Sequence, residues 1–236
     1  PSALKRAVGG FRTGQVVFRD ANRFRQSVMV LARHGFGAAL ERMRVADAGL
    51  LSKIAEMRMN ADEAVPLERR VLHALQELGP TFVKLGQILS TRPDVVPAKL
   101  IEQLQTLQDQ VPPMALEDVY TVVLEDLERP IGEIFAEFDD EPLACASIAQ
   151  VHRAVLPTGE EVVVKVQRRG IRPQIEADVE IMGFLARAAE ENFPEMQTLS
   201  PTGVVAEFEK AILKEIDFRQ ELDHIGRFRR NFEGVP

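Results

Sequence analysis

Charged residues at three places have types and spacings that suit chemistry on an anionic substrate. Lys165 stands in the middle of the apolar run at 162–166, directly after a predicted turn. A lysine in such a strand is costly to bury unless its ammonium group is paired, so it needs a carboxylate or a phosphate. The alternative is a lysine at a strand edge that reaches solvent. The acidic residues Glu215, Asp217 and Glu221 follow on a predicted helix, where they could partner a cation or form a solvated face.

The third place is a helix that begins at Gly79-Pro80 and carries Lys84 and Gln87. Residues three apart share one helical face, so these two side chains point together, away from an apolar stripe on another face. Gly86 costs about 1 kcal/mol relative to alanine inside a helix, which predicts that another backbone or a ligand approaches it closely. The alternative is an ordinary packed helix with two solvated polar residues.

The pattern of apolar residues predicts the elements that position these side chains. Residues 21–110 are predicted to be helical, with breaks at 35–37, 66, 93 and 97, and another helix is predicted at 116–127. Three antiparallel strands are predicted at 134–138, 148–156 and 161–167, with a hairpin turn at 157–160. A helix at 171–192, a loop between Pro194 and Pro201 and a last helix at 201–232 complete the prediction.

Composition narrows the class of protein. The chain has 236 residues, 45% of them hydrophobic and 28% charged, as in globular domains. Cys145 is the one cysteine, which excludes an internal disulfide and a clustered-cysteine zinc site and fits a reducing compartment. The sequence has no run of about 18 apolar residues that could span a membrane, and Pro1 opens no signal-peptide pattern.

The net charge of −7 is unevenly distributed, because residues 1–44 carry nine basic and two acidic side chains, which leaves −14 for the remainder. Phe18, Phe24, Val28 and Leu31 lie among the arginines at loosely helical spacing. They favour either an amphipathic helix on acidic lipid or a helix that packs against the acidic remainder of the chain. No nucleic-acid-binding motif accompanies the charge.

The stretch from Leu78 to Pro97, with Lys84-x-Gly86-Gln87 inside it, resembles the KxGQ signature of the UbiB (AarF) family of atypical protein-kinase-like proteins. Two later stretches agree in order and approximate spacing. Residues 142–152 resemble the alanine-rich loop that stands in this family where protein kinases have a glycine-rich turn, with Cys145 as a minor departure. The segment at 215–221 resembles the family's ExD motif followed by a further glutamate. Together the matching stretches cover about residues 70–236.

The resemblance implies an ATP or ADP site with magnesium. Lys165 would bridge the α- and β-phosphates to Glu221 as in the V-A-I-K strand of kinases, and Val163 would stand where kinases prefer alanine over the adenine ring. Lys84 and Gln87 would lie on a helix across the nucleotide cleft, with Lys84 reaching Glu215, while His152 would be structural. The remaining site residues implied are Ala144, Cys145, Ala146, Ser147 and Val151 for nucleotide, and Glu215 and Asp217 for the KxGQ helix or a metal-bound nucleotide, with no metal ligand assigned within this chain.

The implied fold is α+β: a kinase-like small lobe at 113–236, with an antiparallel sheet and helices, preceded by an all-helical KxGQ extension at 1–112. The H-R-D…N and D-F-G segments of phosphoryl transfer are absent, so the carboxy-terminal lobe is expected to be missing and this segment to be inactive alone. We expect half of an atypical kinase or ATPase for isoprenoid quinone biosynthesis, in the cytoplasm and peripheral at the inner membrane. The alternative is a non-catalytic nucleotide- or lipid-sensing module that docks membranes or quinone-pathway enzymes.

Overall fold

The computed structural model describes residues 12–13, 16–17, 20–45, 48–58, 65–107 and 111–233. It is a mixed structure of helices and antiparallel strands, as expected from the sequence. The helices before the sheet are α1 Ala21–Leu31, a π-helical turn Ala32–Phe36, α2 Gly37–Arg42, α3 Ala48–Arg58, α4 Leu67–Leu78, α5 Pro80–Leu89 and α6 Ala98–Leu104. After them come α7 Leu116–Leu127, α8 Ile131–Ile134, α9 Ile171–Asn192, α10 Pro194–Leu199, α11 Pro201–Glu215 and α12 Phe218–Asn231.

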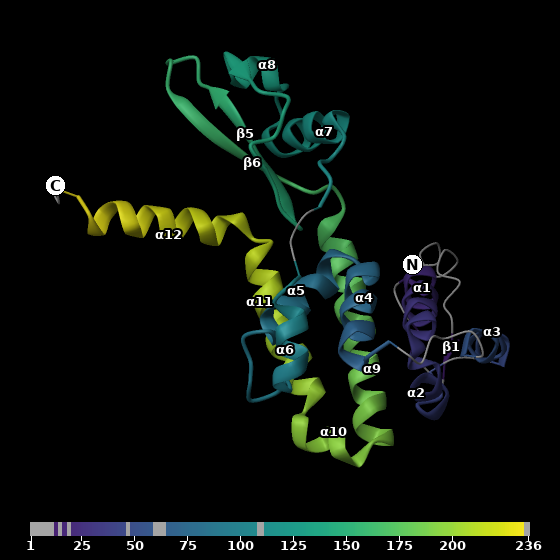
Figure 1. The fold of residues 1–236 in the computed structure, drawn as a ribbon. Coiled ribbons are helices and arrows are strands. Elements are labelled where there is room, and N and C mark those ends of the chain that lie inside the picture. Colours follow the sequence, from purple (N-terminus) through teal and green to yellow (C-terminus); the bar gives the residue numbers. More distant parts are fainter. Residues whose placement is uncertain are drawn as a thin grey trace, which may run out of the picture.

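The strands form two antiparallel sheets. The short strands β1 Arg12–Thr13 and β2 Val16–Val17 pair with each other. In the larger sheet β5 Ala149–Val155 is central: β6 Glu161–Gln167 pairs along one side, while β3 Glu137–Phe138 and β4 Ala144–Cys145 pair along the other. Within the described residues β6 is therefore an edge strand. Figure 1 shows this sheet with α7 and α8 at one end of the molecule and the long helices at the other.

The helical end has its main core around α9, the longest helix. Ile175, Val179 and Met182 of α9 are buried against Phe208 and Ile212 of α11. The same core takes in Val30 of α1, Leu78 of α4 and Phe82 of α5. Residues on both sides of the expected division at 112–113 therefore share one hydrophobic core.

Helix α1 packs its apolar face on α9, in agreement with the second of the two expectations for this helix. Phe24 and Val28 are fully buried and belong to a second core with Ile181 and Ala188. The side chain of Arg23 forms an ion pair with Asp178, with Nε 2.6 Å from Oδ1, and the Asp178 side chain is fully buried. The described part of α1 thus rests on protein through an apolar face and a buried ion pair, while Phe18 lies outside the described residues.

Helices α4, α5 and α6 pack against one another, and α5 carries the KxGQ stretch. Gly79 joins α4 to α5 with a φ of 100°, a conformation that favours glycine. Gly86 faces the partner helices, since a Cβ there would lie 2.5 Å from Leu107 Cδ1 and 2.9 Å from Leu75 Cδ1. The close neighbours of Gly86 are therefore leucine side chains, and the expectation of a backbone or ligand at this position is wrong.

The strands β1 and β2 lie within the stretch 1–112 that was expected to be all-helical, and β4 was not among the predicted strands. Three boundaries also differ from the sequence prediction. The first expected strand begins with the helical turn α8, and only Glu137–Phe138 pairs in the sheet. The expected loop after Pro194 is the helix α10, because proline is well tolerated in a first helical turn. The expected single helix at 201–232 breaks at Ile216 and Asp217, where the Asp217 side chain accepts a hydrogen bond from Arg219 N and starts α12.

Candidate nucleotide site

The two faces of β6 differ, and this difference places Lys165. Alternate residues of a strand point to opposite sides of the sheet. Val162, Val164 and Val166 pack in the core between the sheet and α7, whereas Val163 and Lys165 lie on the other face, with Val163 67% exposed. Lys165 is therefore on an open surface of the sheet, with Val151 of β5 directly opposite it in the register.

The ammonium group of Lys165 pairs with a carboxylate from α12. Lys165 Nζ lies 2.6 Å from Glu221 Oε2, with the two side chains 38% and 51% exposed. The same nitrogen lies 4.5 Å from the ring centroid of Phe218, a cation–π contact. The structure thus joins a strand lysine and a helix glutamate 56 residues apart, and both groups remain open to solvent.

The alanine-rich stretch forms the hairpin between β4 and β5. Ala144 and Cys145 pair with Val151 and Gln150, and Ala146 N donates to Ala149 O across the turn (2.8 Å). Ala144 and Ala146 are exposed and Cys145 is half-buried, whereas Ser147 is only 3% exposed. The exposed part of this turn therefore consists of small side chains and main chain, and the Ser147 side chain is not on its open surface.

A buried polar network supports the hairpin from beneath. The Gln150 amide nitrogen donates to His152 Nε2 (2.8 Å), and His152 Nδ1 lies 2.8 Å from the carbonyl of Asp139. Since Gln150 supplies the proton at Nε2, His152 is the tautomer that carries its hydrogen on Nδ1. His152 is fully buried and stacks on Phe138. These contacts agree with the expected structural role of His152.

Arg168, which directly follows β6, holds the turn in place through three hydrogen bonds. Its backbone N–H donates to Ile148 O (2.9 Å). Its side chain donates from Nε to Ala146 O (3.0 Å) and from Nη2 to Pro112 O (2.8 Å). Burial lowers the pKa of the Arg168 guanidinium. The sequence analysis did not include this residue, because an arginine after a strand carries no signal of its own.

The KxGQ residues contact two different parts of the chain. Lys84 Nζ lies 2.7 Å from Oε1 of Glu215, the last residue of α11, and the two side chains are 22% and 36% exposed. Gln87 Nε2 donates to Leu107 O (3.4 Å). Asp217 caps α12, where its side chain accepts a hydrogen bond from Arg219 N. Both lysine–glutamate pairs thus flank the break at Ile216 and Asp217, which we call the elbow.

The elbow is attached to the lysine strand and lies beside a polar pocket. Gln167 of β6 donates from Nε2 to Ile216 O (2.7 Å). The pocket, of about 500 Å³, lies between α7, the end of β6 and the elbow, and its polar lining residues are Asp126, Lys165, Gln167, Arg172, Asp217 and Arg219. Strand β6 and helix α12 are therefore positioned relative to each other by a hydrogen bond as well as by the ion pair.

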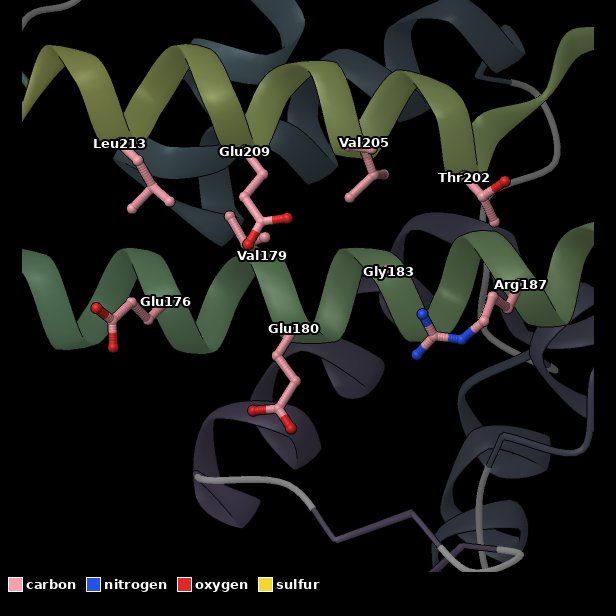
Figure 2. Close-up of a pocket in the computed structure, with 10 residues that line it drawn as sticks. Glu176, Val179, Glu180, Gly183, Arg187, Thr202, Val205, Glu209 and Leu213 are labelled. Atoms are coloured by element: carbon pink, nitrogen blue, oxygen red, sulfur yellow. The ribbon is translucent and has the colours of Figure 1, made fainter.

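A second hollow lies far from Lys165. This groove of about 540 Å³ runs between α9 and α11, with Val179, Val205 and Leu213 among its lining residues. Figure 2 shows Glu209 of α11 pointing toward Val179, while Glu180 points away from α11. None of the predicted site residues lines this groove. Among the described residues, no group of three or more His, Cys, Asp or Glu side chains could hold a metal ion.

Comparison with known proteins identifies the family. The model of the ABC1 atypical kinase-like domain matches residues 106–236, more than half of the chain. The chain belongs to the ABC1 atypical kinase-like family. The matched residues include the alanine-rich turn, Lys165, the elbow and Glu221. The resemblance predicted from the sequence is confirmed.

Curated relatives of the ABC1 domain agree with this assignment. The probable protein kinase UbiB of Pseudomonas fluorescens strain SBW25 is 48% identical over 167 residues, which are 71% of this chain and 31% of the relative. The probable protein kinase UbiB of Marinobacter nauticus is 46% identical over 167 residues, 71% of this chain and 30% of the relative. The chain therefore spans about a third of the length of these relatives.

Among solved structures, the complex of Rv3197 with erythromycin from Mycobacterium tuberculosis aligns with a TM-score of 0.45 and 28% sequence identity. The alignment covers 81% of this chain and 46% of that chain. The assignment to the ABC1 family rests on the sequence matches. Within the described residues, none of the helices combines the length and the apolar character needed to cross a membrane.

Proposed function

We propose that the chain is the nucleotide-binding half of an atypical kinase or ATPase that supports isoprenoid quinone (ubiquinone) biosynthesis or lipid handling at a membrane. The observation that carries the proposal is the ion pair between Lys165 and Glu221 on the open face of the sheet. Kinases use such a pair to orient a lysine toward the α- and β-phosphates. Membership of the ABC1 family and the UbiB relatives support this proposal.

The proposed ligand is ATP or ADP with magnesium. The residues present suit the phosphates and the base of the nucleotide, while no metal ligand is assigned among the described residues. Lys165 supplies a cation on a surface open enough for phosphates, and Glu221 orients it. The turn of Ala144, Cys145, Ala146 and Ser147 offers main-chain groups with small side chains around them, which permits close approach. Val151 and Val163 lie on the strands beside Lys165 and would contact the base. The bound nucleotide would supply the phosphoryl group.

The KxGQ helix is proposed to gate this site. Lys84 holds Glu215, which lies just before the elbow, and Glu221 lies just after it. Gln87 contacts the segment that leads to the sheet. Lys84, Gln87, Glu215 and Asp217 would therefore set the direction of α12, and through it the position of Glu221. A helix that lies across the nucleotide cleft, as the family resemblance implies, favours a small or lipid-like substrate over a protein substrate.

The division into a helical extension at 1–112 and a kinase-like lobe at 113–236 is part of the same proposal. The H-R-D…N and D-F-G segments that supply the catalytic base and the metal ligands are absent from these 236 residues. We therefore propose that this segment binds nucleotide without transferring phosphate, and that any enzyme activity needs further residues.

The test is magnesium-dependent binding of ATP and ADP by calorimetry and thermal shift, on the full gene product. Lys165→Ala and Lys165→Arg remove or alter the phosphate contact, Lys84→Ala removes the contact to Glu215, and Lys99→Ala on the exposed side of α6 is the matched control. The expected result is lost binding with Lys165→Ala, changed affinity with Lys84→Ala and no change with Lys99→Ala. Folded wild-type protein that binds neither nucleotide would overturn the proposal.

A non-catalytic sensing module is the second candidate, because two ion pairs meet at one elbow and make α12 suited to a switch. Such a module would bind nucleotide or lipid and present a changed surface to an anionic membrane or to quinone-pathway enzymes. Nucleotide binding without hydrolysis in the presence of anionic vesicles would favour this candidate. Hydrolysis stimulated by the vesicles would favour the enzyme.

A further inference from the structure

The alanine-rich turn is supported unevenly on its two sides. Ile148 and Ala149 are buried in the main core, and Ala146 N donates to Ala149 O across the turn. On the other side, Ala144 and Ala146 are exposed and bury little apolar surface, and the pairing of β4 with β5 covers only two residues. The position of Ala146 must therefore depend on groups beyond its own strand.

Arg168 contacts both sides of the turn. Its N–H and Nε reach the carbonyls of Ile148 and Ala146, on the two sides of Ser147. The guanidinium is a rigid planar fork whose donors point in fixed directions, so the bond at Nε and the bond at Nη2 are made together. The second of these bonds goes to Pro112 O, shortly before α7.

We propose that Arg168 is a positioning residue for the nucleotide-binding turn and that it attaches this turn to the main chain at Pro112. The inference rests on the proposed nucleotide site and adds a residue to it. Arg168 fixes the carbonyl of Ala146 so that the exposed main chain of the turn keeps one arrangement toward the phosphates. Fixing the turn in advance lowers the entropy lost when a nucleotide binds.

Described residues before the sheet also contact the site. Leu107 packs on Gly86 and its carbonyl accepts the hydrogen bond from Gln87. Pro112 O accepts from Arg168, and Met114 N donates to Gln150 Oε1 (2.8 Å). The stretch 112–114 is therefore bound to the alanine-rich hairpin at two points.

Arg168 and its neighbour Arg169 form a matched pair for the test. Arg169 carries the same charge one residue later, but it contacts Asp118 and Glu125 of α7 and not the turn. Arg168→Met removes both side-chain bonds, Arg168→Lys keeps the charge but not the planar fork, and Arg169→Met is the control. Circular dichroism and thermal melting verify that each variant is folded.

The first measurement is amide hydrogen exchange of the chain without nucleotide. Arg168→Met is expected to raise exchange at Ala146 and its neighbours by about tenfold or more, with Arg168→Lys between it and the wild type, and Arg169→Met unchanged. Amides in the middle of α9 serve as the internal reference. Unchanged exchange in the turn of Arg168→Met would overturn the proposal, whatever the nucleotide results are.

The second measurement is the dissociation constant for magnesium ATP and ADP in the full gene product. Arg168→Met is expected to weaken binding about tenfold relative to Arg169→Met at equal thermal stability, with partial recovery in Arg168→Lys. Equal affinity in Arg168→Met and Arg169→Met would overturn the positioning role. Wild-type protein without nucleotide binding would instead overturn the proposed function, and the exchange experiment would still decide whether Arg168 fixes the turn.

Discussion

Helices α11 and α12 follow each other in the chain but are held in different ways. Phe208 and Ile212 of α11 are buried in the main core, and the helix also makes ion pairs with Lys84 and with Arg92, which follows α5. None of the side chains of α12 is buried, and Figure 1 shows this helix extending away from the rest of the molecule. The proposed Glu221 therefore lies on the less constrained of the two helices.

This difference indicates how the site could respond to a ligand. Buried apolar contacts fix α11, so Glu215 stays near Lys84. Helix α12 is held at its start, by its cap at Asp217 and by Phe218, which packs against the edge of the main core and contacts Lys165, and one turn later by the Lys165–Glu221 pair. Exposed ion pairs contribute about 0–1 kcal/mol. A nucleotide that draws Lys165 and its partner Glu221 toward the phosphates would therefore change the orientation of α12 at a small cost in free energy.

The largest effect expected from this comparison is that of phenylalanine truncation. Phe208→Ala on α11 should destabilise the chain by about 3–5 kcal/mol, because Phe208 is only 2% exposed and its removal leaves a cavity. Phe228→Ala on α12 is the control: it should change stability by less than about 0.5 kcal/mol, because Phe228 is 64% exposed. Urea unfolding measures both values, and a similar loss in the two variants would contradict the comparison.

Hydrogen exchange should show the next largest difference. Amides in the middle of α11, near Ile212, are expected to be protected about 100-fold more than those in the middle of α12, near Ile225, because only α11 is covered by the core. The measurement uses the chain without nucleotide. Equal protection along both helices would mean that α12 is held by contacts stronger than those described.

The two ion pairs should differ by a smaller amount in double-mutant cycles. The coupling between Lys84→Met and Glu215→Gln is expected to be about 1 kcal/mol, and that between Lys165→Met and Glu221→Gln about 0.3 kcal/mol, because the second pair is more exposed. Urea unfolding at low salt gives the free energies of unfolding of the seven proteins, since the two cycles share the wild type. A larger coupling energy for the pair at Lys165 than for the pair at Lys84 would contradict the proposal that α12 is held less firmly than α11.

The smallest effect concerns the exposed end of the contact between α5 and α11. Hydrogen bonds from Arg92 lower the pKa of the Asp94 carboxyl. Asp94 therefore stabilises the fold at pH values above its unfolded pKa of about 3.9. This contribution is lost as the pH falls through the lower pKa of the folded state. Asp94→Asn should therefore lower the free energy of unfolding by a small amount at pH 7, and its difference from the wild type should decrease toward pH 3. A difference that stays constant over this range would contradict the prediction.

The sequence predicted the elements whose signal is local. Helix α9 was predicted with the bounds that the structure has, because apolar residues recur along it with helical period. The lysine strand and its hairpin were equally clear, because β-branched residues and a Pro-Thr-Gly turn mark them. The pairing of Lys84 with Glu215, which the structure contains, was expected only through the family resemblance, because no local pattern links residues so distant in sequence.

What the sequence could not predict depends on packing and on single hydrogen bonds. The elbow was missed because helical residues continue on both sides of Asp217, and only its capping bond shows the break. The neighbours of Gly86 were misjudged because leucine side chains, not a backbone, fill the space that glycine leaves. Arg168 was missed because its contacts reach to Pro112, 56 residues earlier in the chain.

Within the part of the chain that the structure describes, β6 is an edge strand, and this affects how a lysine variant should be interpreted. Edge strands expose unpaired main-chain groups, and an apolar edge invites intermolecular pairing that a charged side chain discourages. Lys165 is the charge in the middle of the valine run at 162–166. Lys165→Ala removes it, so this substitution should promote aggregation as well as remove a phosphate contact. Light scattering alongside every binding measurement distinguishes a monomer that does not bind nucleotide from an aggregated protein. Lys165→Arg, which retains the charge, is the control that should not aggregate.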